Sequence, residues 1–142
     1  MDRETIVELI QAFYQSRLAN SIDSCVGHFA ANARLRIAGS TEASPIAGSS
    51  GPETLRRHVA GLVADWEWRS MEIRSLLIDG NRVAVHYRLG TRYVPTGDVI
   101  SSEIVDLIEI SDDGRIGSYI EFVDTAATAA LAAKQRSDGG LQ

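Results

Sequence analysis

The chain has few of the residues and runs that mark several common classes of protein. It contains a single cysteine, Cys25, which excludes a disulfide within the chain. Its longest apolar runs are far shorter than the ~20 residues that a membrane-spanning helix needs. Its first residues mix acidic and basic side chains and do not have the pattern of a signal peptide. These absences predict a cytoplasmic protein that does not enter a membrane.

Basic clusters and metal-ligand patterns are also missing. The net charge of −5, with no basic cluster, argues against nucleic acid as a partner. The three histidines, His28, His58 and His86, are scattered and form no spacing such as H-E-x-x-H, so we expect no metal. We expect His58 on the exposed side of a helix. Cys25 lies at helical spacing with apolar neighbours, which favours a buried thiol over a nucleophile.

The residues that are present predict three helices in the first half of the chain. Asp2 is a plausible N-cap for a first helix, and a second, short helix follows near Cys25. The segment "SGPE" at 50–53 is a capping box, with Pro52 inside the first turn of a third helix. The first helix carries one stripe of Ile6, Leu9, Ile10, Phe13 and Arg17. The third carries a core-facing stripe of Leu55, Val59, Leu62, Val63 and Trp66.

The second half of the chain alternates apolar and polar residues in long segments. Strands are predicted at 33–37, 69–78, 82–94, 99–110 and 115–122, with turns such as "DGN" between them. An alanine-rich helix over 125–133 follows. The small, polar segment 39–50 is predicted to be a mobile loop. The order predicts one α+β domain over 1–133, with a flexible tail over 134–142. Its curved, cone-shaped antiparallel sheet would carry helices on the concave face and enclose a pocket.

The last two strands place two carboxylates near each other. If the "SDDG" turn makes Ile110 pair with the residue that follows the turn, the numbers of paired residues sum to 225. Asp106 then faces Tyr119. Glu121 becomes a diagonal neighbour of Asp106, with Cβ atoms roughly 5–8 Å apart on the same face.

The opposite face of this hairpin is also largely apolar. It is predicted to hold Val105, Leu107, Ile116, Ile120 and Phe122. Two apolar faces indicate that one packs around the cavity and that a partner buries the other, so a monomer is disfavoured. A parity error of one residue would exchange the two roles.

Three segments resemble the nuclear transport factor 2 superfamily, which includes ketosteroid isomerases, limonene epoxide hydrolases and SnoaL-like polyketide cyclases. They are "ELIQAFYQSRLANSIDSCVGHFAANARLRI" at 8–37, "SGPETLRRHV" at 50–59 and "RIGSYIEFVD" at 115–124. The resemblance covers nearly the whole chain and implies the fold. It implies little about chemistry, because this superfamily hosts many functions.

The catalytic residues of the relatives are only partly present. Phe13 and Ile37 fall where ketosteroid isomerases have a tyrosine and an aspartate base, whereas Asp106 matches their oxyanion-hole acid. Tyr87 and Leu89 replace two of the three catalytic residues of the epoxide hydrolases. Glu121 matches the single acid of SnoaL-like cyclases, with Glu in place of Asp. The resemblance therefore disfavours the first two mechanisms.

The resemblance also assigns the face of Asp106 and Glu121 to the cavity and the opposite face, with His86, to a homodimer. The predicted wall consists of Phe13, Ile37, Trp66, Val85, Tyr87, Ile104, Asp106, Tyr119 and Glu121. Two carboxyls in an apolar wall raise each other's pKa, so one keeps its proton near neutral pH. This pair would be the acid and base of a cofactor-independent isomerase, cyclase or hydrolase acting on a small apolar carbonyl compound.

Other interpretations of the same residues stay open. Glu121 could be a structural partner of a tyrosine, and Asp106 could simply accept a hydrogen bond from Tyr119. The domain could be a non-catalytic module that binds a hydrophobic ligand. It could also be an oligomerising subunit, and then side chains would fill the cavity.

Overall fold

The first helix begins at the N-cap that the sequence predicts. In the computed structural model, which describes residues 1–39, 49–50 and 52–140, the Asp2 carboxylate accepts a hydrogen bond from the Thr5 amide at 2.8 Å. Helix α1 runs over Arg3–Leu18 and ends before Asn20, whose φ of 54° turns the chain sharply. Its buried residues recur at helical spacing, as the predicted stripe requires.

The remaining helices and strands follow the predicted order with shifted ends. They are α2 (Ile22–Gly27), β1 (Phe29–Ile37), β2 (Ser49–Ser50), α3 (Pro52–Asp65), β3 (Trp66–Asp79), β4 (Arg82–Tyr93), β5 (Asp98–Ile110), β6 (Ile116–Phe122) and α4 (Thr125–Gly140). Pro52 opens α3, as predicted. Trp66 was predicted on this helix and instead begins β3. Most of the loop predicted at 39–50 lies outside the described residues.

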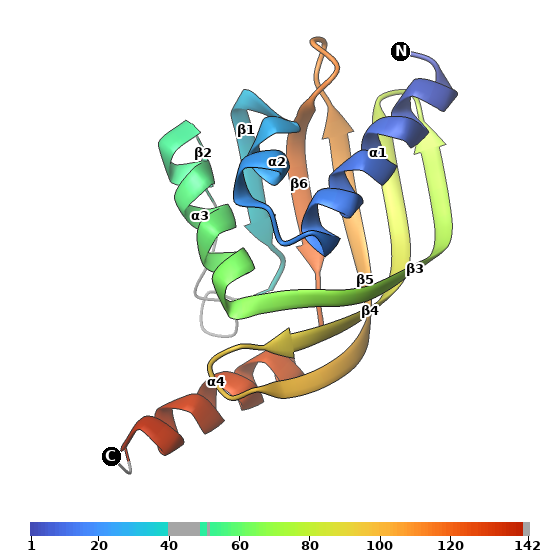
Figure 1. Ribbon diagram of the computed structural model, residues 1–142. Coiled ribbons are helices and arrows are strands. Elements are labelled where there is room, and N and C mark those ends of the chain that lie inside the picture. The colour runs from blue at the N-terminus through green and yellow to red at the C-terminus, as the bar shows by residue number, and fades with distance from the viewer. Residues whose placement is uncertain (40–48, 51, 141–142) are drawn as a thin grey trace.

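The strands form a single sheet in the order β2-β1-β6-β5-β4-β3. Figure 1 shows this sheet strongly curved, with α1, α2 and α3 on one face and α4 at its lower end. The predicted α+β class is confirmed. Neighbours from β3 to β6 are antiparallel, but β1 runs parallel to β6. The prediction of an antiparallel sheet is therefore wrong for the β1–β6 pair, because alternation along a strand does not indicate which strand will lie beside it.

The register of the β5–β6 hairpin differs from the predicted one. Ile110 pairs with Ile116, and an extra residue, Gly117, forms a bulge before the regular pairing resumes. A Cβ at Gly117 would lie 3.3 Å from the Ser111 side chain, so the bulge favours glycine. The two one-residue shifts bring Asp106 directly opposite Glu121.

The bulge also changes the face of one residue. Ile116 was predicted on the outer face and is fully buried in the core. Beyond the bulge the register is shifted by two residues in total, and an even shift leaves each side chain on its predicted face. Asp106, Tyr119 and Glu121 therefore share the inner face as predicted.

The two faces of the sheet are both partly apolar, as the alternation indicates. Along β4, Val83, Val85, Tyr87 and Leu89 are buried under the helices. On the outer face, His86 lies 3.4 Å from Glu103 of β5. The exposed large apolar side chains include Leu77, Val99, Val105, Leu107 and Phe122. The outer face thus carries exposed apolar side chains among charged ones, and no described element of the chain covers these apolar groups.

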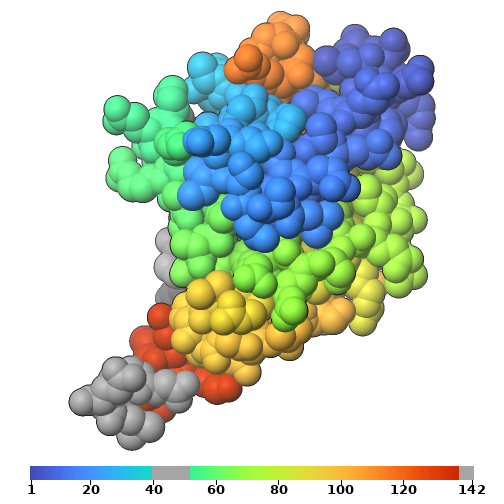
Figure 2. Space-filling model, in the orientation of Figure 1, coloured from blue at the N-terminus to red at the C-terminus, as the bar shows by residue number. Residues whose placement is uncertain are grey.

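The C-terminal helix is longer than the sequence predicts. It continues to Gly140, beyond the predicted end at Ala133. Lys134 lies 3.0 Å from Asp98 at the start of β5, and Tyr93 donates a hydrogen bond to Gln135. The helix is therefore tied to the β4–β5 hairpin. Figure 2 shows this hairpin beside α4, below the part of the molecule that α1 and α2 cover. No helix in the described part of the chain is long and apolar enough to cross a bilayer.

Candidate functional site

Asp106 lies at the centre of the concave face and accepts three phenol hydrogen bonds on one oxygen. Tyr14 of α1 donates to Oδ2 at 2.6 Å and Tyr87 of β4 at 2.7 Å, and Tyr119 of β6 donates to the same atom. The carboxylate is fully buried. Three elements that are distant in the sequence therefore meet at one acceptor atom.

The three phenols decide the state of this carboxyl group. Burial raises the pKa of Asp106, and the hydrogen bonds from Tyr119, Tyr14 and Tyr87 limit the rise, so that the resulting pKa is about 6. Burial, together with the negative charge of Asp106, raises the pKa of all three phenols well above their usual value. At neutral pH the cluster therefore holds an ionised Asp106 among neutral tyrosines.

Glu121 faces Asp106 across the β5–β6 pair but has a different environment. Directly opposed residues have Cβ atoms about 4.5–5.5 Å apart. Burial, together with the charge of Asp106, raises the pKa of Glu121 to about 8, against the opposing effect of Arg17. Since no phenol or amide donates to the side-chain carboxyl of Glu121 among the described hydrogen bonds, this carboxyl keeps its proton at neutral pH.

Glu121 lines a cavity of about 270 Å³ at the open end of the concave face. Its wall is mostly apolar and includes Ile37, Leu62, Trp66, Trp68, Leu89, Ile100, Ile104 and Val123. Alanine side chains of α4 close one side. Arg17, Glu121, Thr91 and Ser102 contribute polar groups, and the exposed residues Asp65, Asp124 and Arg136 contribute charged ones. A small apolar cavity with a few convergent polar groups is the usual form of a ligand site, and its presence argues against the interpretation that side chains fill the domain.

The structure separates the predicted cavity wall into two groups. Ile37, Trp66, Ile104 and Glu121 line the cavity. The other predicted wall residues, Phe13, Val85, Tyr87, Asp106 and Tyr119, are not among the lining residues and are buried in the core. Large rings cause this, because they fill the deep end of the concave face: Phe13 packs 5.4 Å from Tyr119, and Tyr14 packs 5.2 Å from Tyr87.

Two residues of the site were not predicted. Tyr14 supplies the third phenol to Asp106. Arg17 lines the cavity, is 8% exposed, and places its guanidinium carbon 4.6 Å from the centre of the Trp68 ring. The signal for Arg17 was present, because an arginine four residues after Phe13 continues an otherwise apolar stripe.

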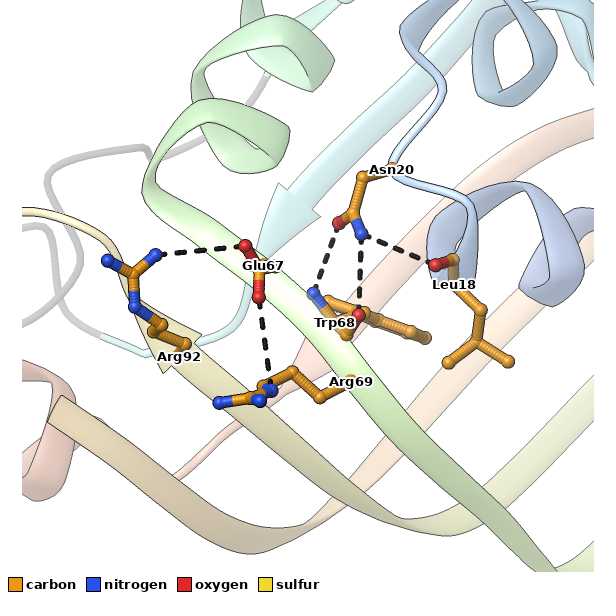
Figure 3. Close-up of polar contacts among 6 residues, drawn as sticks. All are labelled: Leu18, Asn20, Glu67, Trp68, Arg69 and Arg92. Carbon is orange, nitrogen blue, oxygen red and sulfur yellow. Dashed lines mark hydrogen bonds and ion pairs between the residues drawn. The ribbon is translucent and has the colours of Figure 1, made fainter. Parts of the chain in front are cut away.

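A short polar contact fixes this corner of the site (Figure 3). The Asn20 side chain accepts a hydrogen bond from the Trp68 amide at 3.1 Å and donates to the Trp68 carbonyl at 3.3 Å. It also donates to the Leu18 carbonyl, at 3.3 Å. The end of α1 is thereby tied to β3, which positions the Trp68 ring beside Arg17.

The remaining candidate groups lie apart from the cavity. Cys25 is buried, as expected, and burial raises the pKa of its thiol. His28 is the C-cap residue of α2. His58 was predicted to be exposed but is 9% exposed, so that prediction is wrong: its face of α3 also packs inward. Among the described residues, no cluster of three or more His, Cys, Asp or Glu could hold a metal.

Comparison with known proteins assigns the fold to a family. The sequence model of the SnoaL-like domain matches residues 10–119. The chain belongs to the SnoaL-like domain family. The superfamily inferred from the three sequence segments is thereby confirmed. No curated protein sequence matches the chain.

Solved structures share the fold of this SnoaL-like domain at low sequence identity. BvnE pinacolase from Penicillium brevicompactum superposes with a TM-score of 0.79 at 16% identity, covering 96% of this chain and 98% of that one. An NTF2-like protein from Burkholderia pseudomallei gives 0.76 at 13%, covering 92% and 98%. An LEH-like epoxide hydrolase of M. tuberculosis gives 0.69 at 13%, covering 87% and 85%. At these identities the likeness shows the fold alone.

The structure corrects one residue of the family comparison. The ungapped match aligns Phe13 with the first-helix tyrosine of ketosteroid isomerases, so this chain has no tyrosine at that aligned position. In this SnoaL-like chain the next residue, Tyr14, reaches Asp106. Phe13 instead packs edge-on against Phe29, 5.5 Å away, within the core.

Proposed function

We propose that this SnoaL-like domain is a cofactor-independent enzyme that moves a proton next to a carbonyl group of a small, mostly apolar substrate. The observation that carries the proposal is Glu121, a carboxyl with a raised pKa in the wall of an apolar cavity. A group whose pKa lies near the working pH is both available as a base and effective as an acid. Glu121 is the residue that would touch the substrate.

The proton transfer needs no group other than Glu121 and the substrate itself. The ionised form of Glu121, which is the minority form at neutral pH, takes a proton from the carbon next to the carbonyl. The electron pair of the C–H bond forms a C=C bond, and the π pair of the carbonyl moves onto its oxygen. The Glu121 carboxylic acid then returns the proton to a different atom of the same substrate. The enzyme is restored, and nothing is oxidised or reduced.

Asp106 takes a different role from the one its sequence position indicates. Because it is sealed behind three phenols and does not line the cavity, it acts through Glu121 and is a positioning residue. Its negative charge opposes ionisation of Glu121 and so maintains the high pKa of that group.

Hydrogen exchange at carbon tests the proposal without a known product. Small ketones and 1,3-dicarbonyl compounds are incubated with the protein in D₂O, and loss of the proton next to the carbonyl is followed by NMR. We expect Glu121→Gln to reduce the exchange rate by roughly 10²-fold or more. Glu109→Gln is the matched control, because Glu109 is exposed on the outer face of β5. Equal rates in the wild type and Glu121→Gln would contradict the role of Glu121.

The apolar wall also supports a second function, a module that binds a hydrophobic ligand without converting it. Native mass spectrometry of the purified protein distinguishes the two. A retained small molecule, with no proton exchange in any compound of the panel, would favour this binding function over catalysis.

We propose further that two copies associate through the outer sheet face and that the protein works in the cytoplasm. The exposed apolar side chains of this face, such as Leu107 and Phe122, support the dimer. Sedimentation equilibrium tests it. The wild type should sediment as a dimer and a Leu107→Lys, Phe122→Glu double variant as a monomer. A monomeric wild type would contradict the proposal.

A further inference from the structure

Arg17 is a buried cation with an unused hydrogen-bond donor. It lies in the last turn of α1, where the helix dipole favours positive charge. Its side chain lines the cavity, and its Nη1 has no acceptor among the residues that the structure describes. Buried donors normally have a partner, because an unmade hydrogen bond in the interior is costly. The missing acceptor therefore points to a group that enters the cavity.

The neighbouring carboxyl groups do not supply that acceptor. No carboxylate of the described residues forms an ion pair with Arg17 within 4.0 Å. Asp106 accepts its three phenol hydrogen bonds on Oδ2, and its buried Oδ1 has no hydrogen-bond partner among the described residues, so Arg17 does not donate to either oxygen. Glu121 keeps its proton at neutral pH and carries no charge there. Asp65 and Asp124 also line the cavity but are exposed, so water and salt screen them.

The guanidinium is held in place before any ligand arrives. Its carbon lies 4.6 Å from the centre of the Trp68 ring, and Asn20 fixes the Trp68 backbone to the end of α1. Figure 3 shows Asn20 between Leu18 and Trp68. A donor fixed in this way loses little freedom when it binds, which strengthens binding.

We propose that the cavity binds a small molecule with an apolar body and one anionic oxygen group, such as a carboxylate, and that this group accepts a hydrogen bond from Arg17. Charge-assisted hydrogen bonds from arginine to carboxylate are stronger than neutral ones, so the cavity should prefer an anionic ligand group to a neutral one. The apolar body packs against Trp66 and Ile104. The volume of about 270 Å³ limits the ligand to small compounds. This inference rests on the proposed function in that it places the acidic end of the substrate in the same cavity as Glu121.

The chain provides a direct optical readout of this binding. Its only two tryptophans, Trp66 and Trp68, both line the cavity. Titration of tryptophan fluorescence with phenylacetate, 3-phenylpropanoate and 4-phenylbutanoate, each beside its primary amide, compares an anionic with a neutral group on the same body. We expect the best carboxylate to bind the wild type at least about 10-fold more tightly than its amide.

Variants assign the preference to Arg17. In Arg17→Gln the preference for the carboxylate should disappear, and in Arg17→Lys, which keeps the charge, part of it should remain. Arg34→Gln is the control, because Arg34 is an exposed arginine of β1 and does not line the cavity. It should bind like the wild type. Circular dichroism shows whether each variant folds. If Arg17→Gln does not fold, the comparison of acid and amide binding by the wild type still tests the inference.

Two results would overturn the inference. One is equal affinity of the wild type for acids and amides, or no saturable binding of any acid. The other is a carboxylate preference that survives in a folded Arg17→Gln. Failure of the proposed catalysis looks different. In that case Glu121→Gln leaves proton exchange unchanged while the carboxylate preference and its dependence on Arg17 persist.

Discussion

Asp106 and Glu121 are paired residues on adjacent strands and point to the same face, yet their surroundings differ. Asp106 is sealed in the core, with three phenols donating to one oxygen. Glu121 lines a cavity whose buried cationic group, Arg17, makes no ion pair with it among the described contacts. The packing of the neighbouring side chains separates the two, because rings fill the deep end of the concave face, whereas the side chains of the open end, Trp66 and Trp68 among them, leave a cavity between them.

This comparison shows how one carboxyl can serve another. Burial with several donors stabilises the ionised form of Asp106, and burial beside that charge stabilises the protonated form of Glu121. The charge held at the closed end of the sheet therefore contributes, after burial, to the raised pKa of the carboxyl at the open end. Three predictions test the contrast.

The largest difference in unfolding free energy should appear when one apolar side chain is truncated at the closed end of the concave face and another at its open end. Phe13→Ala should lower the free energy of unfolding by about 3–5 kcal/mol, because Phe13 is packed in the closed end. Ile37→Ala should cost about 1–2 kcal/mol, since part of the Ile37 surface already faces the cavity. Equilibrium unfolding in urea measures both. Equal losses would mean that the two ends are packed alike.

Removal of a phenol oxygen should show a smaller contrast. Tyr87→Phe deletes a donor to the buried, ionised Asp106 and should cost about 2–3 kcal/mol of unfolding free energy. Tyr93→Phe removes a hydrogen bond to the uncharged Gln135 near the cavity and should cost about 1 kcal/mol. Thermal unfolding at a fixed pH compares them. A cost for Tyr87→Phe as small as that for Tyr93→Phe would argue that Asp106 is not ionised.

The smallest effect concerns pH. The pKa of Glu121 is raised on folding, from 4.5 to about 8, so the folded state holds this proton more tightly than the unfolded state. The stability that this proton contributes is complete below pH 4.5 and is lost as the pH rises towards and through 8. The melting temperature of the wild type should therefore fall, relative to that of Glu121→Gln, between pH 5 and 9.

Asp106→Asn tests the cause of this pH dependence. Loss of the Asp106 charge should lower the pKa of Glu121, whereas burial, the larger cause, remains and keeps it above its usual value. The fall in melting temperature should then end at a lower pH and be smaller in total, because it still begins near the unfolded-state pKa of 4.5. Parallel curves for the wild type, Glu121→Gln and Asp106→Asn would show that Glu121 does not titrate in this range.

Much of the fold could be predicted because its signals are local. Asp2, Pro52 and the "DGN" turn each specify the backbone within a few residues, and the structure places a helix start or a turn at each. The parallel neighbour of β1 and the bulge at Gly117 were missed. Both depend on how a strand meets a partner, and the period of the sequence does not record that.

The candidate site divides in the same way. The pairing of Asp106 with Glu121 could be approached from the sequence, because two residues on one face of a hairpin stay on one face through an even change of register. Tyr14 and Arg17 could not be placed, since their roles depend on where α1 crosses the sheet.

The sequence by itself determined the α+β class and the presence of two carboxyls on one face of the last hairpin, and the family resemblance assigned that face to the cavity. Only the tertiary structure decided which of those carboxyls a ligand can reach. Alternation along a strand states which side chains point inward, whereas access depends on the combined volume of side chains from α1 and every strand of the concave face. At the deep end that volume is filled by the rings around Asp106, and at the open end it leaves the cavity that Glu121 and Arg17 share.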